Sequence, residues 1–126
     1  MLDTHILIWA VSSSRRLSAR SRAALLSSES TVFVSAATAW EIAIKQALGR
    51  LEFPIHRYEE VLAAMSCESL PMRAVHCIEA GGLPRHHDDP FDRMLIAQAR
   101  LEQLLLVSAD PVFARYEVPL FERSEQ

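Results

Sequence analysis

The sequence predicts an α/β protein in which helices cover both faces of a central parallel sheet. Short apolar runs, rich in β-branched and aromatic residues, alternate with helix-like segments of about ten residues. Half of the 126 residues are hydrophobic and only 3 are glycine, so the chain can bury a core and should be globular. Strands that alternate with helices in this way are typical of parallel sheets.

The first half of the chain is expected to contribute two strand-like and two helical segments. In chain order these are a β-rich run at residues 2–9 (LDTHILIW), a helix at 18–28, a strand at 31–35 (TVFVS) and a helix at 36–48. Ser18 and Ser35 are the expected N-caps of the two helices, because a serine side chain can accept a hydrogen bond from a free amide of the first turn. Gly49 suits the left-handed end of the second helix.

The second half continues the alternation after a break at Pro54. We expect helices at residues 56–66, 73–81 and 90–103, short strands at 69–72, 104–108 and 118–121, and a helical turn at 112–116. Residues 83–89 (LPRHHDD) form the loop before the longest of these helices. No internal repeat or low-complexity tract interrupts the pattern, which predicts a single domain over residues 1–126.

Composition excludes several classes of protein. No apolar run approaches the roughly 18 residues that a membrane span requires, and no positively charged leader precedes the run at residues 5–11. Cys67 and Cys77 form no CxxC motif, so we expect reduced thiols and a cytoplasmic protein. The formal net charge of −3 does not by itself indicate a nucleic-acid-binding protein.

Four acidic residues are expected at one rim of the sheet, where parallel strands end and ligands collect. Asp3 lies in or at the end of the first strand, Glu41 lies in the helix after the second strand, Asp92 begins a helix, and Asp110 follows the strand at 104–108. Each can reach the same rim. The sequence therefore predicts a cluster of carboxylates.

Some of the acids also have purely structural explanations. Asp89 and Asp110 each precede a proline, the usual arrangement of an N-cap followed by the first helical position, and capping is the favoured role of Asp89. Asp92 and Glu41 differ because each shares a helix face with apolar residues. An acid on such a face needs a partner. A salt bridge to Lys45, the one lysine, could satisfy one of them, but a functional role is favoured for both.

Clustered carboxylates must take up protons or bind a cation. Oxygen ligands favour Mg²⁺ or Mn²⁺, and such ions suit the hydrolysis of phosphodiesters. Zinc is the competing metal, because His5, His86 and His87 lie near these acids, but no HExxH motif is present. A pocket-lining or backbone-bonding role is favoured for His86 and His87.

Four segments together resemble the PIN domain, and specifically the VapC-like ribonuclease toxins of bacterial type II toxin–antitoxin pairs. These segments are LDTHILIW, VSAATAWEIAIKQALGRLEFP, LPRHHDDPFDRMLIAQA and LLLVSADPVFARYEVPL, and they span nearly the whole chain. The resemblance implies a Rossmann-like, three-layer α/β/α domain with a parallel sheet. It also implies a Mg²⁺- or Mn²⁺-dependent endoribonuclease that forms a homodimer and is held inactive by a cognate VapB-like antitoxin.

The resemblance assigns the acidic site to the same four residues. Asp3 and Asp92 would hold the principal metal, Glu41 and Asp110 would complete its ligand shell or hold a second ion, and Thr4 and Ser108 would orient these ligands. Members of the family usually begin a few residues earlier, whereas only Met1 and Leu2 precede Asp3 here. We therefore expect a shortened first strand.

Substrate binding requires positive charge near the acids. Arg93, Arg15 and Arg16 are candidates for contacts with RNA phosphates. Two alternatives to a ribonuclease stay open: a PIN-like module that binds RNA or a partner without cleaving, and another Mg²⁺-dependent phosphohydrolase of the haloacid-dehalogenase type. The second expects an aspartate two residues after the nucleophile, where this chain has His5.

Overall fold

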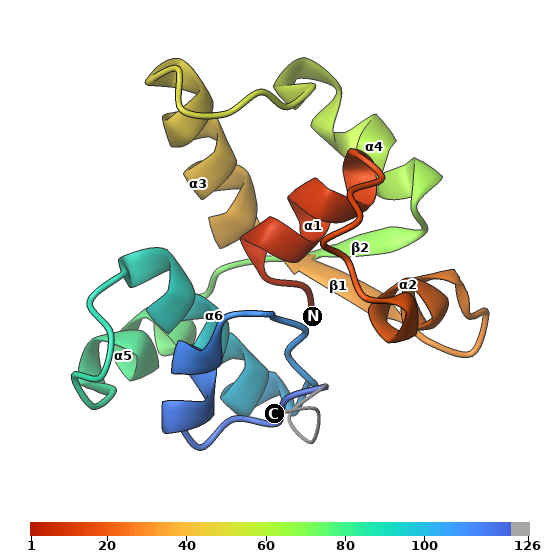
Figure 1. Ribbon diagram of the computed structural model, residues 1–126. Helices are drawn as coiled ribbons and strands as arrows, with labels where there is room; N and C mark the ends of the chain where they lie inside the picture. Colours follow the sequence, from red (N-terminus) through yellow and green to blue (C-terminus); the bar gives the residue numbers. More distant parts are fainter. Residues whose placement is uncertain (122–126) are drawn as a thin grey trace.

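The computed structural model describes residues 1–121, so residues 122–126 of the predicted domain lie outside the described part. The elements in chain order are α1 (Thr4–Val11), α2 (Ala19–Leu26), β1 (Val32–Ser35), α3 (Ala36–Ala47), the 3₁₀ turn η1 (Ile55–Arg57), α4 (Tyr58–Ala64), β2 (Cys67–Leu70), α5 (Ala74–Gly82), α6 (Pro90–Glu102) and the 3₁₀ turn η2 (Pro111–Arg115). Figure 1 shows β1 and β2 between α1, α3 and α4 on one side and α5 and α6 on the other.

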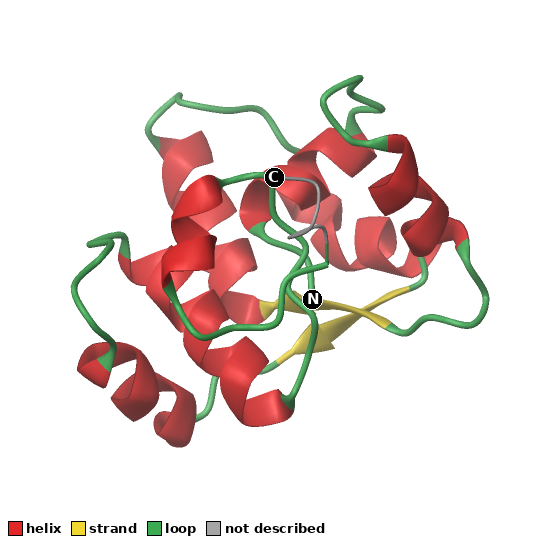
Figure 2. Cartoon of the chain, turned by 60° about the horizontal axis from the view of Figure 1, so that its bottom comes forward, coloured by secondary structure: helices red, strands yellow, loops and turns green. Residues whose placement is uncertain are grey.

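The sheet is parallel and short. Strands β1 and β2 pair from Val32↔Cys67 to Ser35↔Leu70. Three isolated parallel bridges continue the pairing: Leu2 bridges both Val34 and Val107, and Leu106 bridges Leu120. Figure 2 shows the two strands side by side; β1 is largely buried, whereas the residues of β2 are half-buried or exposed. The predicted α/β class and parallel pairing are confirmed, with a sheet of two regular strands in the described residues.

Alternate residues of the paired segments face two separate apolar clusters. Leu2, Val34 and Val107 belong to the cluster with α1, α3 and α4. Met1 and Leu106 belong to the cluster with α6 and the segment around η2. This period of two is the pattern of a sheet that is buried on both faces.

Residues 2–9 correct a prediction, because most of this segment is helical. The Asp3 side chain caps α1 by accepting a hydrogen bond from the Ile6 amide at 2.8 Å. The run ILIWAV is apolar on every face, and periodicity cannot distinguish such a run from a buried strand. The strands predicted at 104–108 and 118–121 are also reduced, to the isolated bridges at Leu106, Val107 and Leu120.

The helices that carry the acids agree with the predictions. Ser18 and Ser35 cap α2 and α3, Asp89 caps α6, and Gly49 has a φ of +71° just after α3. The 73–81 helix is confirmed as α5. No helix within residues 1–121 is long and apolar enough to cross a membrane.

A buried polar contact fixes α3 relative to α6. Ser35 Oγ donates to Gln98 Oε1 at 2.5 Å, and Gln98 Nε2 donates to the carbonyl of Pro71 at 3.2 Å. Both side chains are fully buried. Ser35 ends β1 and caps α3, so this contact ties the start of α3 to the middle of α6. These two helices carry Glu41 and Asp92.

Candidate metal centre

Asp3 lies where the chain leaves the sheet at Leu2 and enters α1. Its buried carboxylate accepts hydrogen bonds from the Ile6 amide and from Ser108 Oγ. Burial raises the pKa of Asp3 above its usual value, the two hydrogen bonds lower it, and the nearby charge of Asp110 raises it. Ser108 thus has the contact that its predicted orienting role requires.

Glu41 projects from α3 towards the start of α1. Thr4 Oγ1 donates to Glu41 Oε1 at 2.6 Å, and both side chains are buried. Because Thr4 follows Asp3 directly, this bond places Glu41 beside the residue next to Asp3. Lys45, one helical turn on, contacts Glu41 Oε2 at 2.5 Å. The salt bridge considered from the sequence is therefore present, and Glu41 has both a partner and a neighbouring acid.

Asp92 lies in the first turn of α6, which Asp89 caps. Asp89 Oδ1 accepts hydrogen bonds from the amides of Phe91 and Asp92 at 2.9 and 3.0 Å. Burial raises the pKa of Asp92 to about 6, a hydrogen bond from His87 opposes this, and the charges of Asp89 and Glu41 raise it. The effect of Glu41 indicates that the α3 carboxylate lies within electrostatic range of Asp92.

An aromatic pair stands beside these two acids. The Trp40 and Phe91 rings meet edge to face with centroids 5.1 Å apart. Trp40 precedes Glu41, and Phe91 precedes Asp92. The contact therefore holds α3 and α6 together at the point where their carboxylates approach.

Asp110 lies at the edge of the group. Its side chain is exposed and caps η2 by accepting a hydrogen bond from the Val112 amide at 3.0 Å. The Asp110 amide donates to Ser108 Oγ at 3.0 Å, the hydroxyl that also holds Asp3. Asp110 thus caps η2 and also lies near Asp3.

His87 is a member of the site that sequence reasoning missed. Its Nε2 lies 2.7 Å from Asp92 Oδ2, so its side chain contacts an acid rather than backbone. One signal pointed to this contact. Asp92 is the third helical residue after the Asp89 cap, a position whose side chain can reach back towards the cap, and His87 lies two residues before that cap.

The carboxylates suit a hard divalent cation, but they are not all at ligand distance. Within residues 1–121, the one trio of histidine, cysteine or acidic side chains with ligand atoms within 4.8 Å of one another is His87, Asp89 and Asp92. Asp3 and Glu41 lie outside that trio. The oxygen-rich donor set and the raised pKa of Asp92, partly caused by other carboxylates, both fit a cation that would relieve their repulsion.

The Arg93 side chain forms hydrogen bonds within the protein. Its guanidinium donates to four backbone carbonyls, those of Ala80, Leu83, Pro84 and His87, at 2.9 to 3.2 Å. These bonds fasten the loop that carries His87 to α6. Only one donor of the guanidinium is left for a phosphate. Arg15 and Arg16 are exposed. RNA contact by the three arginines stays a prediction.

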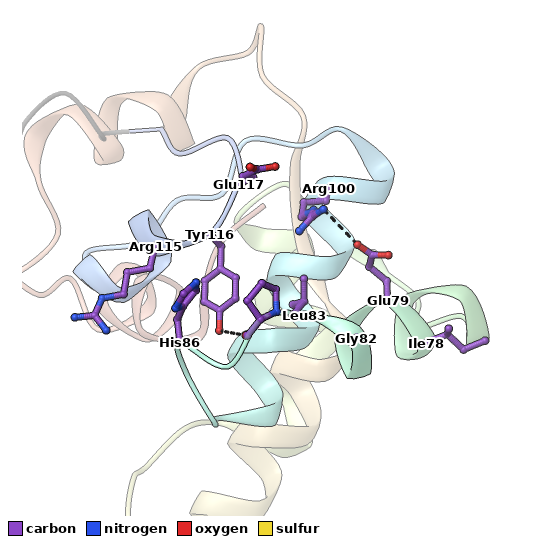
Figure 3. A pocket seen from close by; sticks show the side chains of 10 residues that line it. Ile78, Glu79, Gly82, Leu83, His86, Arg100, Arg115, Tyr116 and Glu117 are labelled. Carbon is purple, nitrogen blue, oxygen red and sulfur yellow. Dashed lines mark hydrogen bonds and ion pairs between the residues drawn. The ribbon is translucent and has the colours of Figure 1, made fainter.

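His86 lines a cavity of about 410 Å³ behind the same loop. Figure 3 shows its ring against Tyr116, with centroids 5.2 Å apart, and the Tyr116 hydroxyl donating to the Pro84 carbonyl. Arg100 faces Glu79 at 3.6 Å in the same cavity. His86 thus has the pocket-lining role expected from the sequence, in a cavity whose basic and acidic residues balance.

The fold is that of an α/β protein with a short parallel sheet. Acidic residues from the start of α1, from α3 and from the first turn of α6 form its candidate metal centre. The chain belongs to the PIN domain family, whose family model matches residues 1–119. PIN domains are typically metal-dependent nucleases, generally with Mg²⁺. A search of curated proteins gives no match.

The raised pKa of Asp92 predicts a pH dependence of stability. The folded protein binds this proton more tightly than the unfolded chain, so the stability linked to Asp92 is full below its ordinary pKa of 3.8 and is lost as pH rises through about 6. We expect the free energy of unfolding in EDTA to fall over this range, and to fall less for Asp92→Asn. Urea unfolding at about pH 4 and about pH 7.5 measures both slopes. An identical fall in the free energy of unfolding for both proteins would contradict a raised pKa of Asp92.

Proposed function

We propose that this protein is a metal-dependent endoribonuclease and the toxin of a toxin–antitoxin pair. One observation carries the proposal: Thr4, the residue after Asp3, donates a hydrogen bond to Glu41, and the charge of Glu41 raises the pKa of Asp92, although Asp3, Glu41 and Asp92 are far apart in the chain. Membership of a family of nucleases agrees with it. Within residues 1–121 Glu41 has an ion pair with Lys45, whereas Asp3 caps α1 and accepts from Ser108 without an ion-pair partner.

Mg²⁺ or Mn²⁺ would be held by Asp3 and Asp92, with Glu41 and Asp110 completing the ligand set. When bound, the ion would supply a lowered pKa for water and positive charge against the phosphate. The chain itself would orient the ligands, with Ser108 on Asp3 and Thr4 on Glu41. Hydrolysis would break one phosphorus–oxygen bond of the RNA backbone as water adds to phosphorus.

The same acidic group supports a proposed inhibitor. A cognate VapB-like antitoxin could place a basic side chain against carboxylates whose charges already repel. We also propose a homodimer, since α5 exposes Val75 and Ile78, the latter 77% accessible.

A second candidate is a PIN-like module that binds RNA or a partner without cleaving. The Lys45–Glu41 ion pair favours it, because a lysine on one carboxylate partly replaces a metal ion. Cleavage assays separate the two.

Metal dependence of RNA cleavage tests the proposal. We expect purified protein to cut a structured RNA with Mg²⁺ or Mn²⁺, to stop in EDTA, and to resume when excess Mn²⁺ is restored. Gel analysis of end-labelled RNA measures the rate in each condition. Equal cutting in EDTA would contradict a metal-dependent nuclease. No cutting by folded protein that binds Mn²⁺ would favour the binding module.

A further inference from the structure

A small cavity opens beside the candidate metal centre, on the side of Asp3. It has a volume of about 230 Å³ and is lined by Asp3, His5, Trp9, Arg16, Ala109 and Asp110. Its volume is below the roughly 300–1,000 Å³ of typical small-molecule sites, which suits one base better than a larger ligand. Two of its residues, Asp3 and Asp110, belong to the acidic group.

Helix α1 gives this cavity an aromatic wall. His5 and Trp9 are four residues apart on the helix and share a face, with ring centroids 6.1 Å apart and planes tilted by 39°. Trp9 is half-buried and packs partly against the apolar cluster under α1, whereas His5 is exposed. The tryptophan ring is therefore anchored on one side while it lines the cavity on the other.

Arg16 supplies the one positive side chain among the lining residues that is charged at neutral pH whatever its surroundings. Within residues 1–121 its guanidinium has no ion-pair or hydrogen-bond partner. Its backbone is nevertheless placed, because Ser14 Oγ accepts from the Arg16 amide at 3.1 Å and the Ser14 amide donates to the Trp9 carbonyl at 2.8 Å. Arg16 is thus fixed beside Trp9 with its charge unused.

We propose that this cavity is a subsite for single-stranded RNA, in which Trp9 and His5 stack one unpaired base and Arg16 contacts an adjacent phosphate. An aromatic platform beside a cation is the combination that binds single strands without base pairing. The position next to Asp3 and Asp110 places the bound nucleotide beside the group that would cleave the chain. The subsite rests on the proposed ribonuclease function and assigns Trp9, His5 and Arg16 to binding the RNA strand beside the acidic group.

The subsite distinguishes two neighbouring arginines. Arg15 is exposed but does not line the cavity, whereas Arg16 does. A general attraction between basic residues and RNA would involve both equally. A defined subsite requires only Arg16.

Binding of a short fluorescein-labelled single-stranded RNA, measured by anisotropy in EDTA, tests the subsite without cleavage. We expect Trp9→Ala to weaken binding roughly 5- to 100-fold and Trp9→Phe to retain most of the affinity, because a ring face remains. Arg16→Ala should weaken binding and lower the salt dependence by the share of about one phosphate. Arg15→Ala removes a charge outside the cavity and should weaken binding less than Arg16→Ala does, and an RNA duplex should bind weakly.

Trp9→Ala removes a half-buried ring, so circular dichroism must show that the variant folds. If it does not fold, His5→Ala and Arg16→Ala, both at exposed positions, test whether the cavity binds RNA. Unchanged affinity in these two variants, or equal losses for Arg15→Ala and Arg16→Ala, would overturn the subsite.

Cleavage separates the subsite from the nuclease proposal. If RNA is cut and Arg16→Ala raises KM with kcat unchanged, both stand. If RNA is cut and the lining variants have unchanged KM, the subsite fails alone. If RNA is never cut but Trp9 and Arg16 still determine single-strand binding, the nuclease fails and the subsite stands.

Discussion

Asp92→Asn should reduce RNA cleavage at least about 100-fold, the largest effect that we expect from a single substitution. Asparagine keeps the size of the side chain but removes the negative charge that would hold the cation. Cleavage rates with saturating RNA and Mn²⁺ measure the loss, on proteins purified in the same way.

Asp88→Asn is the matched control for this substitution. Asp88 carries the same side chain in the exposed loop just before the helix, and within residues 1–121 it has no hydrogen-bond or ion-pair partner. We expect nearly unchanged cleavage. A similar loss in both variants would mean that the charge of the loop, rather than a ligand position, determines the activity.

Arg93→Lys should destabilise the protein by about 2 kcal/mol or more, because lysine keeps the charge but cannot donate to four carbonyls in fixed directions. The loop at residues 83–87 should also exchange its amide hydrogens faster. Urea unfolding and hydrogen exchange measure the two effects.

Arg100→Lys on the same helix is the control. Within the described residues its guanidinium has one ion-pair partner, Glu79 at 3.6 Å, which lysine can largely replace. A stable Arg93→Lys protein with weakened RNA binding would contradict a loop-fastening role for Arg93. Arg93 would then contact phosphate and would not fasten the loop.

The helices could be predicted from the sequence where a cap and a one-sided apolar pattern agree. Ser35 before α3 and Asp89 with Pro90 before α6 determine where those helices begin. The strand expected at residues 2–9 was wrong, because a run with apolar residues on every face carries no helical periodicity. The two weak strands near the end depend on partners that are distant in the sequence, which local propensity does not encode.

The candidate site was only partly predictable. Glu41 and Asp92 could be selected because acids on apolar faces require a partner, and Asp3 because of its expected place at the end of the first strand. The contacts around these acids could not be predicted. The Thr4 bond to Glu41 depends on how α1 packs on α3, and the cavity at Trp9 depends on a helix that the sequence did not indicate. The contact between His87 and Asp92 could have been predicted from the position of His87 two residues before the Asp89 cap.

Calorimetric titration with Mn²⁺ tests most directly whether Asp3, Glu41 and Asp92 share one ion. We expect Asp3→Asn, Glu41→Gln and Asp92→Asn each to weaken Mn²⁺ binding by about tenfold or more, and Asp88→Asn to leave it unchanged. Loss of binding in Asp92→Asn and His87→Ala, with full binding in folded Asp3→Asn and Glu41→Gln, would contradict the shared site. The ion would then belong to the trio of His87, Asp89 and Asp92 alone.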